Sequence, residues 1–272
     1  MPRIKPGLPV AVVTGAARGI GLAVAEWFLA NGYRVALLDI DRKELNATAR
    51  RLKDPLRVMA IHCDVSDAKQ VKPAVRRVAA GFGRIDALVN NAGVAVFKPI
   101  LETTLEDWLH VLSVNLTGAF ICSQACAPVM LKTGGGSIVS IASISGLRAS
   151  TLRVAYGTSK AGLIHLTRQL AAELGTGGIR ANCIAPGPVD TAMAKLVHSV
   201  AIRQDYHDAI PLDRYGTTGE IAAAVGFLCS PAASYVNGQT LAVDGGFEAT
   251  GVGLPTLRRR KGNPDAHPVK SP

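Results

Sequence analysis

Short apolar runs alternate with longer amphipathic stretches along the chain, and each pair predicts a strand followed by a helix. The first run, Val10–Thr14, is followed by a glycine-rich turn and then by a helix from about Gly19 to Asn31. The alternation predicts further elements at Arg34–Ile40, Asp41–Leu52, Leu56–His62, Ala68–Ala80, Ile85–Asn90, Leu105–Met130, Ser137–Ala142, Tyr156–Leu174, Ile179–Ile184 and Leu241–Val243. We therefore expect an α/β fold of the Rossmann type, a doubly wound and mostly parallel sheet with helices on both faces.

Two segments depart from this rhythm. Asp190–Tyr215 is a mixed segment of the kind that often carries ligand contacts at the carboxyl ends of strands. Residues 251–272 are basic and rich in glycine and proline, which break regular elements. Because the chain length suits one large core, we expect a single domain over residues 1–250 and a C-terminal tail over 251–272.

The formal net charge of +10 is a reason to consider a nucleic-acid partner. The tail supplies +4 of it, from five basic side chains against Asp265, and the remainder is scattered without interleaved aromatic residues. An RNA-binding arm is the alternative, but the distribution favours a solvated tail and no nucleic-acid partner.

Two stretches, Trp108–Leu131 and Ile221–Val243, contain no Asp, Glu, Lys or Arg. Polar residues, proline or glycine interrupt both, so we expect buried segments and no membrane partner. The residues before Val10 include Pro2, Arg3, Lys5 and Pro6 and do not match a signal peptide, which favours a cytoplasmic protein.

Five cysteines form an odd set without a C-x-x-C pair. Cys122 and Cys126 share one helix face, a spacing that also suits a metal ion, but no His or acidic cluster accompanies them. We expect packed free thiols and no metal site.

The turn Thr14–Gly21 has the arrangement expected for a phosphate-binding loop. Gly15 permits a tight turn, while Gly19 and Gly21 let backbone approach a pyrophosphate at a helix N-terminus. The spacing is G-x-x-x-G-x-G, and its place between the first strand and the first helix favours a dinucleotide site over a purely structural turn. Two further candidate cofactor contacts in this turn are Arg18 and Ile20.

Asp39 ends the second predicted strand, where a carboxylate can accept hydrogen bonds from the ribose hydroxyls of NAD. It would repel the 2′-phosphate of NADP, so NAD is the predicted cofactor. Arg18 and Arg42 favour NADP instead, and capping of the next helix is the structural alternative for Asp39, although Asp41 can do that.

Two later loops supply further candidate cofactor contacts. Asp64 and Val65 follow the third strand, where a side chain can meet the adenine amino group or cap the next helix. Asn91 and Gly93 belong to Asn90–Gly93, whose small residues admit a ribose close to backbone.

Tyr156 and Lys160 lie one helical turn apart on the same helix face. Ser143 ends the preceding strand, and Asn115 interrupts the apolar helix predicted at Leu105–Met130. Together with the two loops above, these features resemble the compact, single-domain branch of the short-chain dehydrogenases/reductases. The resemblance runs from about Pro9 to Phe247 and rests on Thr14–Gly21, Asp64, Asn90–Gly93, Asn115, Ser143, Tyr156, Lys160, Pro186–Thr191 and Asp244–Gly246.

The resemblance implies an oxidoreductase that interconverts a secondary alcohol and a ketone by hydride transfer with a nicotinamide cofactor. Tyr156 would be the acid/base, with a pKa lowered by the Lys160 ammonium and the positive nicotinamide. Lys160 would also bind the nicotinamide ribose, and Ser143 would orient the substrate oxygen. Asn115 would hold a water that links Lys160 to solvent, or kink its helix, or do both. The Val189 N–H and the Thr191 hydroxyl would bind the carboxamide of the cofactor, and Pro186 is a further candidate cofactor contact.

The resemblance also implies a pocket and an assembly. The pocket would be formed by Val94–Lys98, Ile144–Val154 and a lid from Thr191 to about Tyr215, with Val94, Val96 and Phe97 as its apolar wall. Its cationic side chains can attract an anion or simply be solvated, and we favour the solvated interpretation; they are Arg148, Arg153, Lys195, His198, Arg203 and His207. Pairing of the helices Leu105–Met130 and Tyr156–Leu174, with small residues at Ala161, Ala171 and Ala172, would give a dimer or homotetramer.

The sequence does not separate sugars, polyols, hydroxy acids and 3-oxoacyl thioesters as substrates. The main alternative is a non-catalytic NAD(H)-binding regulator, for which a complete Ser143, Tyr156 and Lys160 set is not required. An epimerase or dehydratase is a further alternative, although such relatives usually have a longer C-terminal substrate domain.

Overall fold

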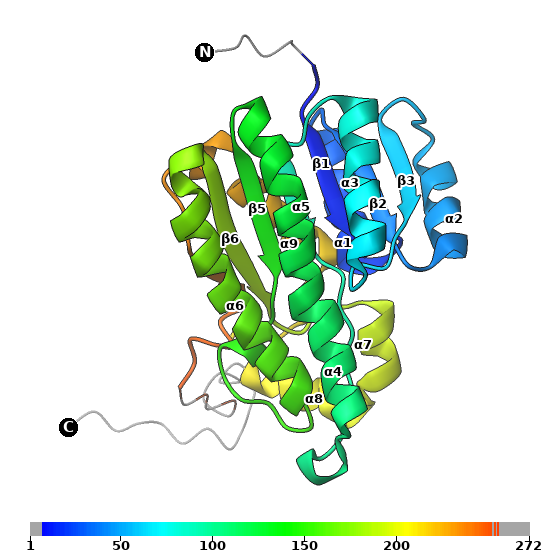
Figure 1. Ribbon diagram of the computed structural model, residues 1–272. Helices are drawn as coiled ribbons and strands as arrows, with labels where there is room; N and C mark the ends of the chain where they lie inside the picture. The colour runs from blue at the N-terminus through cyan, green and yellow to red at the C-terminus, as the bar shows by residue number, and fades with distance from the viewer. Residues whose placement is uncertain (1–6, 252, 254, 256–272) are drawn as a thin grey trace, which may run out of the picture.

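The computed structural model describes residues 7–251, 253 and 255. In this part of the chain, seven parallel strands form one sheet in the order β3-β2-β1-β4-β5-β6-β7 (Figure 1). The strands are β1 (Val10–Thr14), β2 (Arg34–Asp39), β3 (Val58–His62), β4 (Ala87–Asn90), β5 (Gly136–Ile141), β6 (Ile179–Pro186) and β7 (Thr240–Val243). The doubly wound α/β fold expected from the sequence is therefore confirmed.

The helices connect the strands and cover both faces of the sheet. They are α1 (Gly19–Ala30), α2 (Arg42–Leu52), α3 (Ala68–Phe82), α4 (Leu105–Leu112), α5 (Gly118–Thr133), α6 (Val154–Leu174), α7 (Ala192–Val197), α8 (Val200–Ala209) and α9 (Thr218–Cys229). Most of the predicted bounds are correct to within two residues. The predicted tail lies outside the described residues apart from 251, 253 and 255.

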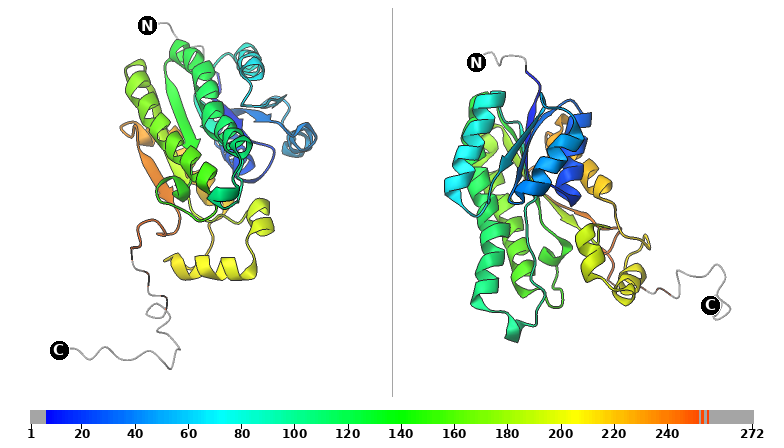
Figure 2. Two further views of the ribbon diagram at one scale, coloured as in Figure 1. Left: turned by 60° about the horizontal axis from the view of Figure 1, so that its bottom comes forward. Right: turned by 90° about the vertical axis from the view of Figure 1, so that its right-hand side faces the viewer.

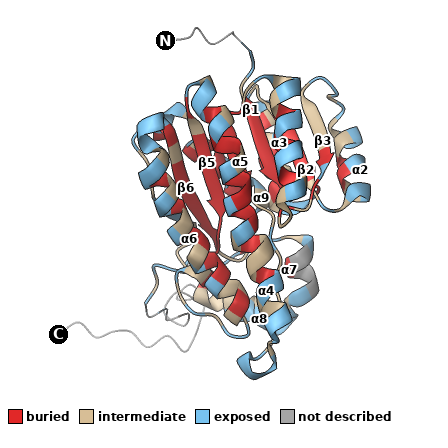
Figure 3. Ribbon diagram, viewed as in Figure 1, coloured by how far each residue is buried: buried red, intermediate tan, exposed pale blue. Residues whose placement is uncertain are grey.

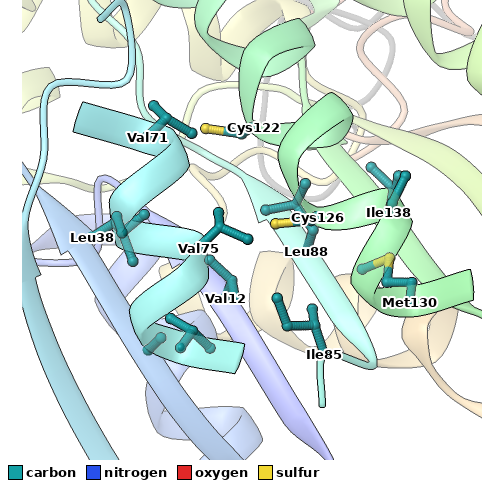
Figure 4. Packing of buried hydrophobic residues seen from close by; sticks show 14 of the residues in the cluster. Val12, Leu38, Val71, Val75, Ile85, Leu88, Cys122, Cys126, Met130 and Ile138 are labelled. Carbon is teal, nitrogen blue, oxygen red and sulfur yellow. The ribbon is translucent and has the colours of Figure 1, made fainter. Parts of the chain in front are cut away.

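Two cores form because successive strand residues point to opposite faces of the sheet. Val12 and Leu88 pack against α3 and α5 on one face, as Figure 4 shows. Their neighbours Val13 and Val89 belong to the other cluster, with Phe28 of α1 and residues of α9. Burial on both faces explains why the inner strands are almost wholly apolar, and Figure 3 shows β1, β2, β5 and β6 as largely buried, whereas the edge strand β3 is mostly half-buried.

The order of the strands places the carboxyl ends of β1 and β4 side by side although the chain leaves them in opposite directions. Such a switch point is where doubly wound sheets bind ligands. The loops after β1, β4, β5 and β6 meet at this edge, and α7 and α8 lie beyond it (Figure 2). The sequence segment that interrupts the βα alternation thus lies at the edge that can hold a site.

The helix predicted over Leu105–Met130 differs from the observed structure. A π-helical turn, Ser113–Thr117, separates α4 from α5, and α5 continues to Thr133. Asn115 lies in this turn, and its side chain forms hydrogen bonds with both backbone groups of Val94, at 2.8 and 2.9 Å. This contact with a distant loop favours the extra residue in the turn, which a helical period alone does not predict.

Leu105–Thr133 is also the one run among the described residues that is long and apolar enough to cross a membrane. Its length and composition are weak support for a span, because core helices satisfy the same criteria. The run packs against α3 and α6, and residues such as Cys122, Cys126 and Met130 are buried in the core.

The packing of α9 on α1 depends on Gly226, and this gives a test of the fold. A Cβ at Gly226 would lie 2.3 Å from Cζ2 of the Trp27 indole, a rigid ring. We expect Gly226→Ala to lower the free energy of unfolding by about 1–3 kcal/mol through overpacking, measured by urea denaturation. Gly219→Ala in the same helix is the control, because its nearest neighbour is 3.9 Å away and alanine is the better helix former. Equal effects of the two variants would contradict this account of the interface.

Candidate active site

The loop between β1 and α1 requires glycine at two positions. Gly15 has φ +62°, and a Cβ on Gly21 would lie 2.2 Å from the Gly15 carbonyl oxygen. Gly19, at φ +58°, faces open space with no atom within 4 Å of an added Cβ. In the described structure no side chain caps α1, and its first turn has no acidic residue. Free backbone N–H groups beside open space fit a pyrophosphate, so these residues suit a dinucleotide.

Thr14 and Asn91 fix this loop across the switch point. Thr14 Oγ1 accepts hydrogen bonds from the backbone N–H of Asn91 and Ala92, each at 3.0 Å. The Asn91 side-chain amide donates to the carbonyl oxygens of Thr14 and Gly15, at 2.9 and 3.0 Å. The Asn91 side chain therefore shapes the glycine turn. Thr14, whose role the sequence analysis missed, is marked in the sequence only by a hydroxyl at the end of an apolar strand.

Asp39 lies at the end of β2, against the same loop. Its two carboxylate oxygens accept hydrogen bonds from Ala17 N and Asp41 N, both at 2.9 Å. Asp41 caps α2 by accepting from Glu44 N and forms an ion pair with Arg18. The structural alternative for Asp39, capping of α2, is therefore wrong. Arg18, a candidate ligand of a 2′-phosphate, has a carboxylate partner, and Arg42 is exposed.

Asp64 and Val65 follow β3 as predicted. Asp64 Oδ1 accepts from the backbone N and the hydroxyl of Ser66, at 2.9 and 2.7 Å. The cap of α3 is Asp67 instead, whose side chain accepts from Lys69 N. The Val65 side chain is buried in the core, so only its backbone can face a ligand.

Ser143, Tyr156 and Lys160 line one cavity of about 250 Å³ at the carboxyl edge of the sheet. Lys160 is 4% exposed and donates to the Ile141 carbonyl oxygen at 2.7 Å. Its Nζ lies 5.6 Å from the centre of the Tyr156 ring. Ser143, Tyr156 and Lys160 thus meet at one cavity, and Asn115 is buried beside them.

Asn115 supports this cluster from outside the cavity. Besides its bonds to Val94, its amide donates to Ser159 Oγ at 3.0 Å. A Cβ on Gly93 would lie 3.2 Å from Asn115 Oδ1 and 3.4 Å from Lys160 Nζ. The Asn115 side chain thereby joins the loop after β4 to α6, while its part in a water relay stays a prediction.

The electrostatics of Tyr156 and Lys160 differ from the expectation in one respect. Desolvation raises the pKa of Tyr156, and a hydrogen bond with Ser143 and the charge of Arg153 lower it by less. Burial lowers the pKa of Lys160 to about 8. The Lys160 ammonium donates its hydrogen bond to the Ile141 carbonyl oxygen. The predicted low Tyr156 pKa is therefore not a property of the protein by itself.

Most of the remaining cofactor and pocket candidates lie beside this cavity. Those that line it are Ile20, Asn91, Gly93, Val94, Phe97, Pro186, Val189 and Thr191. Val96 is half-buried and does not line it. The Thr191 hydroxyl also caps α7 by accepting from Ala194 N at 3.2 Å.

The six cations expected around the pocket separate into two groups. Arg153 and His198 line the cavity. Arg148 stacks on Phe247, Arg203 pairs with Asp190, and His207 bonds to the Asp213 backbone. The side chain of Lys195 lies outside the described part of the structure. The expectation that these side chains do not serve the pocket therefore fits Arg148, Arg203 and His207, whose partners lie outside the cavity lining. It does not fit Arg153, which lines the cavity.

The cysteines are free thiols, four of them buried and Cys229 half-buried. Burial raises the pKa of Cys126 to about 12, which makes it a packing residue rather than a nucleophile. Among the described residues there is no group of three or more His, Cys, Asp or Glu side chains placed to hold a metal ion.

Comparison with known proteins shows that the chain is similar to dehydrogenases and reductases. A family model described as "Enoyl-(Acyl carrier protein) reductase" matches residues 15–248. The chain is 42% identical to D-threitol dehydrogenase from Mycolicibacterium smegmatis, over 88% of this chain and 92% of that protein. It is 39% identical to meso-2,3-butanediol dehydrogenase from Serratia marcescens, over 89% and 95%. A short-chain type dehydrogenase/reductase from Mycobacterium ulcerans superposes with a TM-score of 0.86 at 31% identity, over 89% and 90%.

The buried ammonium of Lys160 should cost stability, which Lys160→Met can reveal. Its pKa is about 8 in the fold against an ordinary 10.5, so folding disfavours the charged form below pH 8. The penalty is complete at pH 7 and disappears as the pH rises from 8 to 10.5. We expect Lys160→Met to be inactive yet more stable than the wild type at pH 7, by roughly 1–3 kcal/mol in urea unfolding. The difference should shrink at pH 10.

The exposed Lys132, in the last turn of α5, provides the control. Lys132→Met should change the free energy of unfolding by less than about 0.5 kcal/mol at either pH. A Lys160→Met protein that is less stable than the wild type at pH 7 would show that the hydrogen bond to Ile141 outweighs the desolvation.

Proposed function

The chain belongs to the short-chain dehydrogenase/reductase family and interconverts an alcohol and a ketone with a nicotinamide cofactor, and we propose that Tyr156 is the acid/base and NAD the preferred cofactor. The observation that carries the proposal is the shared cavity of Ser143, Tyr156 and Lys160 beside the glycine turn. The comparisons give no support to the alternative of a non-catalytic regulator.

We assign the proton transfer to the phenol of Tyr156. When bound, a nicotinamide cofactor would supply the hydride acceptor for oxidation of the alcohol and the hydride donor for reduction of the ketone. In oxidation, Tyr156 takes the hydroxyl proton as a phenolate, and in reduction it gives the proton back. Ser143, already bonded to Tyr156, orients the substrate oxygen and stabilises its developing charge.

Lys160 has two assigned tasks. Its ammonium, fixed by the Ile141 carbonyl, binds the ribose next to the nicotinamide and moves protons toward solvent through water. A pKa of about 8 keeps most of it charged at neutral pH while allowing it to give up a proton. The Asn115 backbone and side chain would hold the first water of that path.

The cofactor would lie along the carboxyl edge of the sheet. Gly15–Gly21 would hold its pyrophosphate, Asp39 the adenosine ribose, and Asp64 with Val65 the adenine. The residues that would hold its nicotinamide half are Asn91, Gly93, Pro186, Val189 and Thr191. Asp39 supports NAD because its carboxylate lies against the Ala17 and Asp41 N–H groups, and because Arg18 is paired with Asp41.

We also propose that residues 1–250 act as one catalytic domain, with a lid over about 191–215, in a cytoplasmic homo-oligomer. Exposed apolar side chains along α4 and α5 support self-association, among them Leu105, Leu109 and Phe120. Of the small residues expected at a helix interface, Ala161 and Ala172 are exposed, whereas Ala171 packs into the core. Relatives that act on threitol and butanediol support small alcohols as the substrate class.

The acid/base assignment predicts the behaviour of Tyr156→Phe. With meso-2,3-butanediol or threitol as substrate, we expect turnover to fall by about 10³-fold or more, because only the proton-transferring oxygen is removed. NADH should still bind within a few-fold, as measured by fluorescence titration. Wild-type oxidation should become faster as the pH rises toward the pKa of Tyr156, since the phenolate is the active form. Substantial activity in the variant would refute the assignment.

The cofactor preference can be tested by comparing kcat/KM for NAD and NADP. We expect the wild type to prefer NAD by on the order of 100-fold, because like charges at the ribose cost several kcal/mol. Asp39→Ala should narrow this ratio. Asp41→Ala, which leaves Asp39 in place and frees Arg18 from its ion pair, should narrow it by a smaller factor. A wild type that prefers NADP would overturn the assignment of Asp39.

A further inference from the structure

Arg153 is a cation of the catalytic cavity that the assigned chemistry does not use. It precedes α6 directly, three residues before Tyr156, and lines the same cavity. Its guanidinium lies 5.1 Å from the centre of the Phe97 ring and donates to the Tyr206 hydroxyl at 3.3 Å. The loop after β4 and the lid helix α8 therefore hold the charge in place from two sides.

The surroundings of Arg153 differ from those of Lys98 and Arg203. Each of these two pairs with a carboxylate, at 2.7 and 2.8 Å. No residue in the described ranges forms an ion pair with Arg153. A half-buried guanidinium with no carboxylate partner among the described residues can take its negative charge from a ligand. Its planar set of donors matches the oxygens of a carboxylate or sulfonate.

We propose that Arg153 binds an oxyanion of the substrate, so that the enzyme acts on a small hydroxy acid or its oxo acid. The proposal rests on the alcohol–ketone function assigned to the same cavity and names its substrate class. Tyr206 is a second ligand of the oxyanion, because its hydroxyl accepts from Arg153 and its own hydrogen remains to be donated. Arg153, Tyr206 and Tyr156 line the same cavity, so a short substrate can contact all three.

The position of the charge explains how recognition and chemistry can be linked. Arg153 already lowers the pKa of Tyr156 and of His198, so it acts electrostatically on both sides of the cavity. An oxyanion on Arg153 places the rest of a short substrate between the guanidinium and the phenol. A neutral polyol lacks this anchor and would be held only by hydroxyl contacts.

Matched substrate pairs test the proposal. The pairs are 2-hydroxypropanoate and its amide, 3-hydroxybutanoate and its amide, and 4-hydroxypentanoate and its amide, with 2-hydroxypropane-1-sulfonate as the sulfonate arm. Each amide keeps the shape of the acid and removes the charge. We expect the wild type to favour at least one acid over its amide in kcat/KM, and Arg153→Met to reduce that ratio about 10- to 100-fold.

Arg148→Met is the control variant, because Arg148 also stacks on a phenylalanine but does not line the catalytic cavity. It should leave the acid-to-amide ratio unchanged. Using the ratio separates recognition from any general effect of Arg153 on Tyr156, which alters both members of a pair. No preference for any acid or the sulfonate, or an equal loss for acid and amide in Arg153→Met, would overturn the proposal.

A binding measurement distinguishes failure of the anion site from failure of the assigned chemistry. Tyr156→Phe loaded with NADH should bind pyruvate, acetoacetate or 4-oxopentanoate in calorimetry, and Tyr156→Phe/Arg153→Met should bind the same oxo acid at least ten-fold more weakly. Binding that depends on Arg153, without turnover of any alcohol by the wild type, would uphold the anion site and refute the chemistry. Turnover of butanediol or threitol, together with no binding of pyruvate, acetoacetate or 4-oxopentanoate, would do the reverse.

Discussion

The contact between the ends of β1 and β4 is the constraint on which the site depends. The chain leaves these two strands toward opposite edges of the sheet, so nothing in the local sequence keeps their loops together. Hydrogen bonds between Thr14 and the Asn91 loop do so, and they also fix the glycine turn at the start of α1. Asn115 extends the same connection from the β4 loop to α6, which carries Tyr156 and Lys160. One chain of polar contacts thus links the cofactor end of the cavity to the catalytic end.

Burial gives the catalytic residues their character. Both Tyr156 and Lys160 are shifted toward their neutral forms, because desolvation disfavours a phenolate and an ammonium alike. Opposite charges added to the cavity therefore matter more than they would in water. A bound nicotinamide, Arg153 and any oxyanion bound to Arg153 would all act on the phenol of Tyr156. The pKa of Tyr156 therefore depends on which of these charges is present.

Much of the fold and the central site could be predicted because they depend on local patterns. The period of apolar residues identified the strands, and the spacing of Tyr156 and Lys160 placed both on one helix face. The π-helical turn at Asn115 could not be predicted, since it depends on a bond to Val94 across the fold. The same is true of Arg153: six cations near the pocket are equivalent in sequence, and only the packing of Phe97 and Tyr206 singles one out. The roles of Asp39 and Asp41 likewise depend on their hydrogen-bond partners, which the sequence does not reveal.

The π-helical turn has a geometric consequence for the rod formed by α4 and α5. One additional residue rotates everything beyond it by about 100° relative to an uninterrupted helix. This rotation lets α4 face α6 while most of α5 faces α3 on the same side of the sheet. Deleting a single residue within Ser113–Thr117 would therefore do more than remove one side chain. It would rotate α4 relative to α5 by about 100° and so turn one of the two helices away from its present neighbour. Insertions and deletions should accordingly be rarer in this turn than its short length suggests.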